Sequence, residues 1–407
     1  MFDKVRKSSG KRMLGKALGG IRVLEYCQMV SGPYCAKLLA DLGAEVIKIE
    51  EPEVGDEARR QGPFPKDVPH LERSGLFLYV NTNKLGITLN LRTVTGKQIF
   101  RELVKETDIL IEDKAPGVME ELGLDYQVLT QLNPSLIMTS VTPFGQNGPY
   151  RNYKAYHLNL YHASGASYFG YMGLRKQPPV KAGGYLGDYD AGLNAAVATL
   201  AAIFVKLING IGQHIDISKL ESLVTLDRVD AGLSANGTVL QRPGILGGLL
   251  RCRDGYVIVV VPQQHQWEGL VELMGRPEWT QSEKCRDEVT RSEHQLEIQP
   301  HIEEWAQQHT KEEIYHRGQA LGLPVGPVNE AEDLDKSQQM KHRCFFVTAE
   351  HPEAGKLQYP AASYRFSQTP WAVERAAPLL GQHNEQVYSR LGLTTLDLSR
   401  MRTAGII

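Results

Sequence analysis

A single carboxylate, Asp188, lies in the glycine-rich stretch Lys181–Gly192, directly before a long apolar segment. Glycine adopts backbone angles that other residues avoid and lets a ligand come close to the main chain. The N-terminus of a helix adds N–H groups that stabilise negative charge. A carboxylate in this setting can act as a nucleophile or as a base. Helix capping is the alternative, because Asp188 or Asp190 before an apolar run is also typical of an N-cap.

The elements that must position Asp188 alternate in type along the chain. From Arg22 onward, short β-branched runs alternate with helical patterns. This alternation predicts an α/β fold with a Rossmann-like parallel sheet and helices on both faces. Ligands on such sheets bind at the carboxyl ends of the strands. The expected strands are 22–26, 45–49, 86–91, 108–112, 136–141 and 213–217, and the expected helices are 34–42, 97–106 and a buried one at 190–208.

Three common motifs are missing from the sequence. The loop after the first expected strand, Cys27–Pro33, lacks the G-x-G-x-x-G spacing, which argues against a nicotinamide cofactor. No G-x-x-x-x-G-K-[ST] phosphate loop is present. Gly165–Gly170 is one residue too long for the G-x-S-x-G elbow of serine hydrolases. Nucleotide hydrolysis and serine acyl transfer are therefore disfavoured.

The composition is that of a soluble protein with room for two domains in 407 residues. The net charge of −2 argues against nucleic acid or a membrane surface as a partner, and no apolar run approaches the ~18 residues of a membrane span. Five cysteines without a C-x-x-C pair indicate neither a disulfide framework nor zinc, and His157 and His162 lack a third metal ligand at suitable spacing. We therefore expect a cytoplasmic protein without a metal site.

The composition and the pattern of apolar residues change along the chain and predict four segments. Residues 1–17 are basic and are expected to form a flexible tail, with an organelle-targeting segment as the alternative. Residues 18–222 are expected to form the large α/β domain, and residues 223–345 a linker and a smaller α+β domain. Residues 346–407 are expected to return to the large domain.

Eight short motifs are spread along almost the whole chain. They are Leu18–Leu24, Ser31–Pro33, Leu39–Glu50, Gly55–Arg59, Asn81–Lys84, Phe144–Pro149, Leu186–Asp188 and Gly212–Ile217. Each alone is weak evidence, but in this order they resemble the class III CoA-transferases, the family of formyl-CoA transferase and carnitine CoA-transferase. The racemase of α-methylacyl-CoA is a relative of this family.

The resemblance implies a CoA-transferase in which Asp188 is the nucleophile. Asp188 would attack the thioester of an acyl-CoA, giving an aspartyl mixed anhydride and then an enzyme–CoA thioester, and a free carboxylic acid would accept the CoA. Coenzyme A is then a substrate, and no permanently bound cofactor is expected. Gly244–Gly248 matches the family's glycine loop and would be a lid, with an ordinary turn as the alternative. An interlocked homodimer is also implied.

The resemblance also implies contacts to CoA. The N–H groups of Val30 and Ser31 would approach the thioester, and Lys84 would bind a phosphate. Where the family often has basic or Asn-Phe residues, this chain has Glu51, Glu121 and Asp113–Lys114, so Lys114, Arg59 or Arg60 would compensate. The implied CoA-binding residues are Val30, Ser31, Arg59, Asn81, Thr82, Asn83, Lys84, Asp113, Lys114, Lys154, Tyr156 and His157.

Two alternative functions stay open. The related racemase pairs an aspartate with a histidine to move an α-proton. In the register that aligns Ser164 and Gly165, Tyr156 replaces that histidine, and a slip of one residue would restore it with His157. The other alternative is a CoA-binding protein that keeps the fold without the chemistry.

Overall fold

The computed structural model describes residues 15–169, 178–226, 228–238 and 246–407. These residues form two compact units. The first unit comprises the chain up to Gly232 together with the C-terminal segment Cys344–Ile407, and the second comprises Leu233–Arg343. The corresponding boundaries expected from the sequence lie after residues 222 and 345. Most of the expected basic tail lies outside the described residues.

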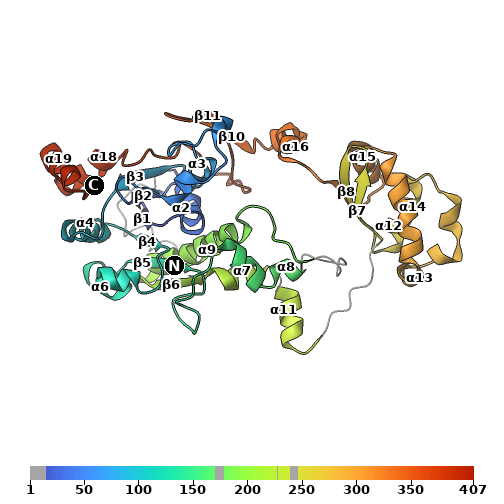
Figure 1. Cartoon of the computed structure of the whole chain (residues 1–407), viewed down its shortest axis with the longest axis horizontal. Helices are drawn as coiled ribbons and strands as arrows, with labels where there is room; N and C mark the ends of the chain where they lie inside the picture. Colours follow the sequence, from blue (N-terminus) through green and yellow to red (C-terminus); the bar gives the residue numbers. More distant parts are fainter. Residues whose placement is uncertain (1–14, 170–177, 227, 239–245) are drawn as a thin grey trace. The chain divides into compact units, whose positions relative to one another are not determined.

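The first unit contains a six-stranded parallel sheet (Figure 1). Its strand order, β3-β2-β1-β4-β5-β6, is that of the Rossmann fold, with the change of direction between β1 and β4. The short apolar runs became strands because both faces of the sheet are covered. The expected α/β fold class is therefore confirmed. The strands are β1 (Arg22–Tyr26), β2 (Glu45–Glu50), β3 (Lys84–Thr88), β4 (Ile109–Glu112), β5 (Ile137–Thr142) and β6 (His214–Ser218).

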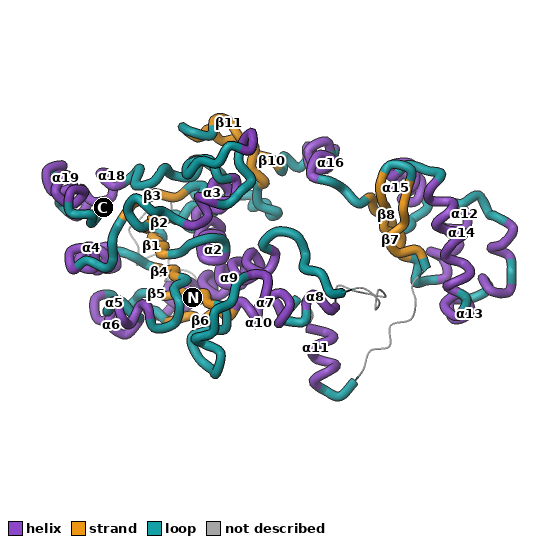
Figure 2. The backbone as a smooth tube through the Cα atoms, in the orientation of Figure 1, coloured by secondary structure: helices purple, strands orange, loops and turns teal. Residues whose placement is uncertain are grey.

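Helices cover the two faces of the sheet (Figures 1 and 2). On one face, α2 (Ser31–Asp41) and α9 (Leu186–Asn209) pack on the strands through small and aliphatic residues such as Leu39, Ala195 and Ile203. On the other face, Phe100, Leu129 and Met401 share a core with β1 and β3. They lie on α4 (Val94–Lys105), α6 (Tyr126–Leu132) and α19 (Thr395–Thr403).

Helix α9 differs from its expected form in two ways. It begins at Leu186, so Asp188 lies in its first turn rather than in a loop before it. The expectation of a buried helix is also wrong, because Leu193, Val197 and Phe204 are 49%, 59% and 63% exposed. By length and composition, α9 is the one helix among the described residues that is apolar enough to cross a membrane. Its inner face is nevertheless occupied by the sheet.

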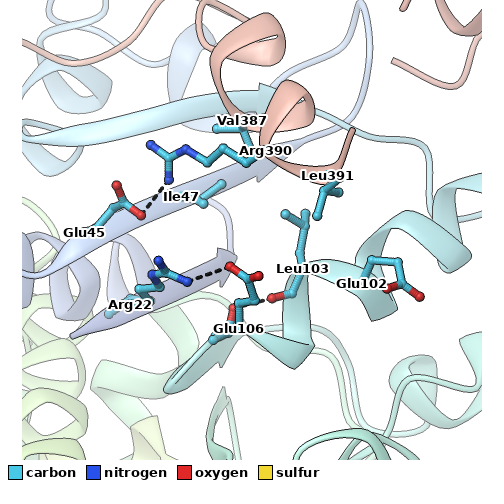
Figure 3. A pocket seen from close by; sticks show the side chains of 11 residues that line it. Arg22, Glu45, Ile47, Glu102, Leu103, Glu106, Val387, Arg390 and Leu391 are labelled. Carbon is cyan, nitrogen blue, oxygen red and sulfur yellow. Dashed lines mark hydrogen bonds and ion pairs between the residues drawn. The ribbon is translucent and has the colours of Figure 1, made fainter. Parts of the chain in front are cut away.

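The C-terminal segment closes the first unit against β2 and β3. Asn384 hydrogen-bonds to the Thr88 side chain (2.8 Å), and the hydroxyl of Tyr388 donates to the Thr88 carbonyl (2.6 Å). Below this segment, Figure 3 shows a small pocket bordered by the ion pairs Arg22–Glu106 and Arg390–Glu45. Arg22 and Glu45 are the first residues of their strands, so this pocket lies at the amino edge of the sheet.

The second unit is built on an antiparallel three-stranded sheet, β7 (Gly247–Cys252), β8 (Gly255–Val260) and β9 (Val325–Pro327). Leu250, Val257, Leu270 and Ile302 form its core with α12 (Gln264–Leu273), α14 (Gln295–Gln307) and α15 (Lys311–Ala320). Of the segment Gly244–Gly248 that was expected to be a lid, residues 244 and 245 lie outside the described residues, and Gly247 and Gly248 begin β7, paired with Val260 and Val259 of β8.

The remaining elements of the two units are short. They are α3 (Gly75–Val80), α5 (Val118–Leu122), α7 (His157–Ala163), α8 (Ala166–Phe169), α10 (Lys219–Thr225), α11 (Arg228–Ala235), α13 (Glu288–Glu293), α16 (Ala331–Lys336), α17 (Gln338–His342), α18 (Asn384–Tyr388), the 3-10 turns η1 (Glu57–Arg60), η2 (Pro65–Asp67), η3 (Glu278–Gln281), η4 (Glu283–Cys285) and η5 (Ser389–Leu391), and the hairpin β10 (Phe346–His351)–β11 (Gly355–Pro360).

Candidate active site

Three helices begin at the carboxyl edge of the parallel sheet. Helix α2 follows β1, α10 follows β6, and α9 runs back from this edge to lead into β6. Helices that connect parallel strands run antiparallel to them, so their N-termini gather where ligands bind. The first turns of these helices carry Ser31, Asp188 and Lys219.

These three side chains meet at one carboxylate. The Ser31 hydroxyl donates to Oδ1 of Asp188 (3.0 Å), and the Lys219 ammonium donates to the same oxygen (2.9 Å). Asp188 is only 8% exposed. Among the described residues, no hydrogen bond to the other oxygen, Oδ2, is found. The carboxylate is therefore oriented through one oxygen, Oδ1.

The capping interpretation of Asp188 is wrong. The N-cap of α9 is Tyr185, whose side chain makes no capping hydrogen bond, and the Asp188 N–H donates to the Tyr185 carbonyl (2.9 Å). The side chain of Asp190 accepts from Asn194, one turn further along the helix (3.2 Å). Neither aspartate is the N-cap of α9, so helix capping does not account for the contacts of Asp188 with Ser31 and Lys219.

Two glycines allow the three helices to approach one another. A Cβ at Gly192 would lie 2.6 Å from the Ser31 carbonyl oxygen, and a Cβ at Gly187 would lie 2.7 Å from the Leu223 side chain on α10. Both distances are shorter than van der Waals contact. Glycine is therefore required at Gly192, where α9 meets the backbone of α2, whereas at Gly187 a side chain would force the flexible end of Leu223 to move.

Lys219 is a residue of the candidate site that sequence reasoning missed. Its side chain is 20% exposed, and its ion pair with Asp188 joins residues 31 positions apart. A local signal was present, because Lys219 comes two residues after the expected strand 213–217, at the edge where ligands bind.

Aromatic rings form a wall beside the site. Tyr34 on α2 packs edge-to-face on Tyr189 with ring centroids 4.9 Å apart, and Tyr79 on α3 lies 6.2 Å from Tyr189. Burial raises the pKa of Tyr189 to about 12, so this hydroxyl stays protonated. The tyrosines give the carboxylate neutral neighbours.

The predicted residues Asp113 and Lys114 lie in the loop that follows β4. The N–H of Gln28 donates to Asp113 Oδ2 (2.8 Å), which joins the loops that follow the two strands. The Lys114 ammonium lies 3.4 Å from Asp113 and 4.2 Å from the centre of the Tyr26 ring. Burial raises the pKa of Asp113, and the charge of Lys114 opposes that shift.

A polar pocket lies beside the loop that follows β4. Burial raises the pKa of Glu112 to about 7, although hydrogen bonds from Ser140 and the Lys114 N–H lower it. Ser140 also contacts Nε2 of His214 (2.8 Å), whose ring stacks on Tyr126 with centroids 5.4 Å apart. These side chains, with Ala115 and Met119, line the pocket.

The structure places Lys84 and Arg59 in the interior. Lys84 is fully buried and contacts Glu25 (2.7 Å), Asn81 (2.8 Å) and the Pro33 carbonyl (2.8 Å). Burial lowers its pKa to about 8. Arg59 is also fully buried, and two of its nitrogens donate to Glu50 (2.6 and 2.8 Å). These contacts speak against the predicted roles of Lys84 and Arg59 as CoA ligands.

The neighbours of Lys84 in sequence also make internal contacts. The Asn81 amide donates to the Phe77 carbonyl (3.0 Å), and Thr82 accepts from Lys37 (2.7 Å). Asn83 donates to Asp41 and to the Ala372 carbonyl, both at 2.7 Å. Their predicted contacts with CoA have no support in this geometry.

The other predicted residues divide into two groups. Val30 is buried and is the N-cap residue of α2, directly before Ser31. Lys154 is exposed and Tyr156 is 74% exposed. His157 begins α7, and its ring packs against Tyr185 with centroids 4.9 Å apart, three residues before Asp188. The structure therefore brings His157 and Val30 toward the site, whereas Lys154 and Tyr156 are solvent-exposed.

No group of three His, Cys, Asp or Glu side chains that could hold a metal ion occurs among the described residues. The site is thus defined by an oriented carboxylate, one ammonium group, one hydroxyl and the N-terminal turns of three helices. These features lie on an α/β fold, at the edge of the parallel sheet where ligands bind.

Comparison with known proteins identifies the family. The model of CoA-transferase family III matches residues 18–384, and the chain belongs to this family. Both the family resemblance and the enzyme class expected from the sequence are thereby confirmed.

Relatives are similar over almost their whole length. The chain is 32% identical to a formyl-CoA:oxalate CoA-transferase of Streptomyces coelicolor, covering 97% of this chain and all of that protein. It is 31% identical to a succinyl-CoA–D-citramalate CoA-transferase of Chloroflexus aurantiacus, covering 96% and 98%. The crystal structure of a CAIB/BAIF family protein from Brucella suis has a TM-score of 0.83 at 28% identity and covers 92% and 99%.

Replacing Gly192 tests whether the approach of α9 to α2 sets the site. Gly192→Ala places a methyl group against the Ser31 carbonyl, so we expect a loss of about 1–3 kcal/mol in the free energy of unfolding and a loss of activity. Chemical denaturation and steady-state kinetics measure the two effects. Gly232→Ala is the control, because a Cβ there meets nothing within 4 Å. Wild-type stability and activity in Gly192→Ala would show that the contact is not tight.

Replacing Glu112 tests whether burial in this pocket raises the pKa of its carboxyl group. Because its folded pKa is raised to about 7, the native state binds a proton that the unfolded state has lost, and its contribution to stability falls as the pH rises from 5 to 8. Glu112→Gln should therefore be more stable than wild type at pH 8 by about 2 kcal/mol, with a smaller difference at pH 5. Thermal unfolding at the two pH values measures this. The exposed Glu120→Gln serves as control, and an equal effect of Glu112→Gln at both pH values would contradict the shifted pKa.

Proposed function

We propose that the protein transfers coenzyme A from an acyl-CoA to a free carboxylic acid through covalent intermediates on Asp188. The observation that carries the proposal is the orientation of Asp188, whose Oδ1 is held by Ser31 and Lys219, whereas no residue that the structure describes makes such a contact to Oδ2. Family membership supports CoA transfer as the overall reaction.

The first half of the reaction exchanges the acyl group for CoA. Oδ2 of Asp188 attacks the thioester carbonyl, the C–S bond breaks, and a mixed anhydride and a CoA thiolate form. The thiolate then attacks the aspartyl carbonyl, giving an aspartyl–CoA thioester and releasing the donor acid as its carboxylate. One negative charge is present before and after each step.

The second half repeats these steps in reverse with a new acid. The acceptor carboxylate attacks the aspartyl–CoA thioester, which gives a second mixed anhydride and the thiolate. Attack of the thiolate on the acceptor's acyl carbonyl forms the new acyl-CoA and restores Asp188. The N-terminal turn of α2, at Val30 and Ser31, supplies backbone dipoles for the oxyanions that develop.

Small acids are the acceptors that we propose. The relatives are named for transfer to oxalate and to D-citramalate. We therefore regard formyl-CoA with oxalate and succinyl-CoA with a hydroxy-dicarboxylate as the first pairs to test.

Trapping the intermediate tests the proposed function. Wild-type protein is mixed with each acyl-CoA and quenched with hydroxylamine, which should leave a hydroxamate on Asp188 that peptide mass spectrometry locates. Asp188→Ala should lose this product and at least about 1,000-fold in kcat. Asp190→Ala is the matched control two residues away, and it should keep both the hydroxamate on Asp188 and the wild-type kcat.

Other outcomes point to the alternative functions. Incorporation of deuterium at the α-carbon of a 2-methylacyl-CoA without a hydroxamate would support proton transfer instead. Tight binding of CoA without any adduct or transfer would support a binding protein. Either result would overturn covalent CoA transfer.

We also propose that the protein is a homodimer. Leu193, Val197, Phe204 and Ile208 are all at least 49% exposed and recur at helical spacing along the outer face of α9. Such an apolar stripe on a soluble protein marks an interaction surface, and a second copy agrees with the dimer implied by the family resemblance.

Light scattering tests the dimer. Wild-type protein should have twice the mass of one chain, and Phe204→Glu should shift it toward the monomer because a charge would be buried at the interface. Leu296→Glu, at a position 90% exposed in the second unit, is the control and should stay dimeric. A monomeric wild type would contradict the proposal.

A further inference from the structure

The ion pair between Lys219 and Asp188 does more than orient a carboxylate. Its Nζ–Oδ1 distance is 2.9 Å, and the two side chains are 20% and 11% exposed. An ion pair so shielded from water is stronger than one on the surface, and losing one partner leaves the other charge poorly solvated. Ser31 already orients Asp188 without a charge, so the ammonium is the component that needs an explanation.

In the proposed reaction, Lys219 loses its anionic partner. When Asp188 is acylated its charge disappears, and the same charge appears on the CoA thiolate. Asp113, whose carboxylate interacts electrostatically with Lys219, has Lys114 at 3.4 Å and the Gln28 N–H at 2.8 Å as its own partners. The Lys219 ammonium is therefore free to pair with the anion that has just been produced.

We propose that Lys219 is a catalytic residue that exchanges anions: it pairs with Asp188 in the resting enzyme, with the CoA thiolate after acylation, and with the incoming carboxylate before the second half-reaction. This role rests on the proposed function. No proton is transferred, because the ammonium stays charged throughout and only its partner changes.

The exchange of anions favours carboxylate over water as the acceptor. A fixed positive charge raises the local concentration of a carboxylate but does little for neutral water. The aspartyl–CoA thioester and the anhydrides are open to hydrolysis, which would waste the activation of the thioester. Lys219 should therefore set the ratio of transfer to hydrolysis, a quantity that a purely structural contact would not control.

Lys219→Met and Lys219→Arg test the proposal with the acyl-CoA and acid that label Asp188 in wild type. Lys219→Met should lower kcat about 100-fold and lower the ratio of transfer to hydrolysis at least about 10-fold. Lys219→Arg keeps the charge and should bring the ratio close to that of wild type. Products are quantified by chromatography of the CoA esters.

Lys206→Met is the matched control. Lys206 lies at the other end of α9, is 17% exposed, and pairs with Asp108 at 2.8 Å, so its loss removes a similar ion pair at the opposite edge of the sheet. Lys206→Met should keep the wild-type ratio of transfer to hydrolysis. If Lys219→Met does not fold by circular dichroism, Lys219→Gln, which keeps a hydrogen-bond donor without the charge, takes its place.

The outcomes separate the two proposals. A wild-type ratio in the neutral Lys219 variant, whatever its kcat, overturns the exchange of anions and leaves covalent transfer on Asp188 intact. An equal fall of the ratio in Lys206→Met would also overturn it. Absence of any hydroxamate in the wild-type protein would remove the proposed function and, with it, the role of Lys219.

Discussion

The buried carboxylate of Glu25 is the constraint on which the site depends. It lies near the carboxyl end of β1 and pairs with Lys48 of β2 (2.9 Å) and Lys84 of β3 (2.7 Å), and all three side chains are fully buried. The Lys48 ammonium also donates to the Cys27 carbonyl in the loop before α2, and the Lys84 ammonium donates to the Pro33 carbonyl in the first turn of α2. Removing one partner of such a buried pair typically costs about 3–5 kcal/mol, because the other charge stays in the interior. The cluster thus fixes the loop that presents Ser31 to Asp188.

Buried acidic partners of this kind explain why two of the predicted basic residues are not free for a ligand. Lys84 and Arg59 are committed to Glu25 and Glu50 inside the protein, although as isolated letters in the sequence they look like phosphate ligands. Lys219 is the opposite case, because its partner is Asp188, the carboxylate that we propose as the nucleophile.

The sequence predicted the parts of the fold that depend on local patterns. Strands β1 and β2 were found almost to the residue because their β-branched runs are short and buried on both faces. β3 begins at Lys84, two residues earlier than expected, because a lysine neutralised by Glu25 can enter a buried strand. Asp188 was recognised from its motif, but its hydrogen bond to Ser31 spans 157 positions and its ion pair with Lys219 spans 31. Such contacts follow from strand order, which no local pattern encodes.

A single cation suits chemistry in which one negative charge changes place. In the proposed reaction, Asp188, the thiolate and the two carboxylates carry that charge in turn, so a site with several fixed cations would hold one anion too tightly to release it. A site without any cation would leave each anion poorly solvated in a largely buried crevice. Ser31 and the helix N-termini add partial charges that orient groups without binding them strongly. The pairing of one buried carboxylate with one lysine therefore balances the binding of each anion against its release.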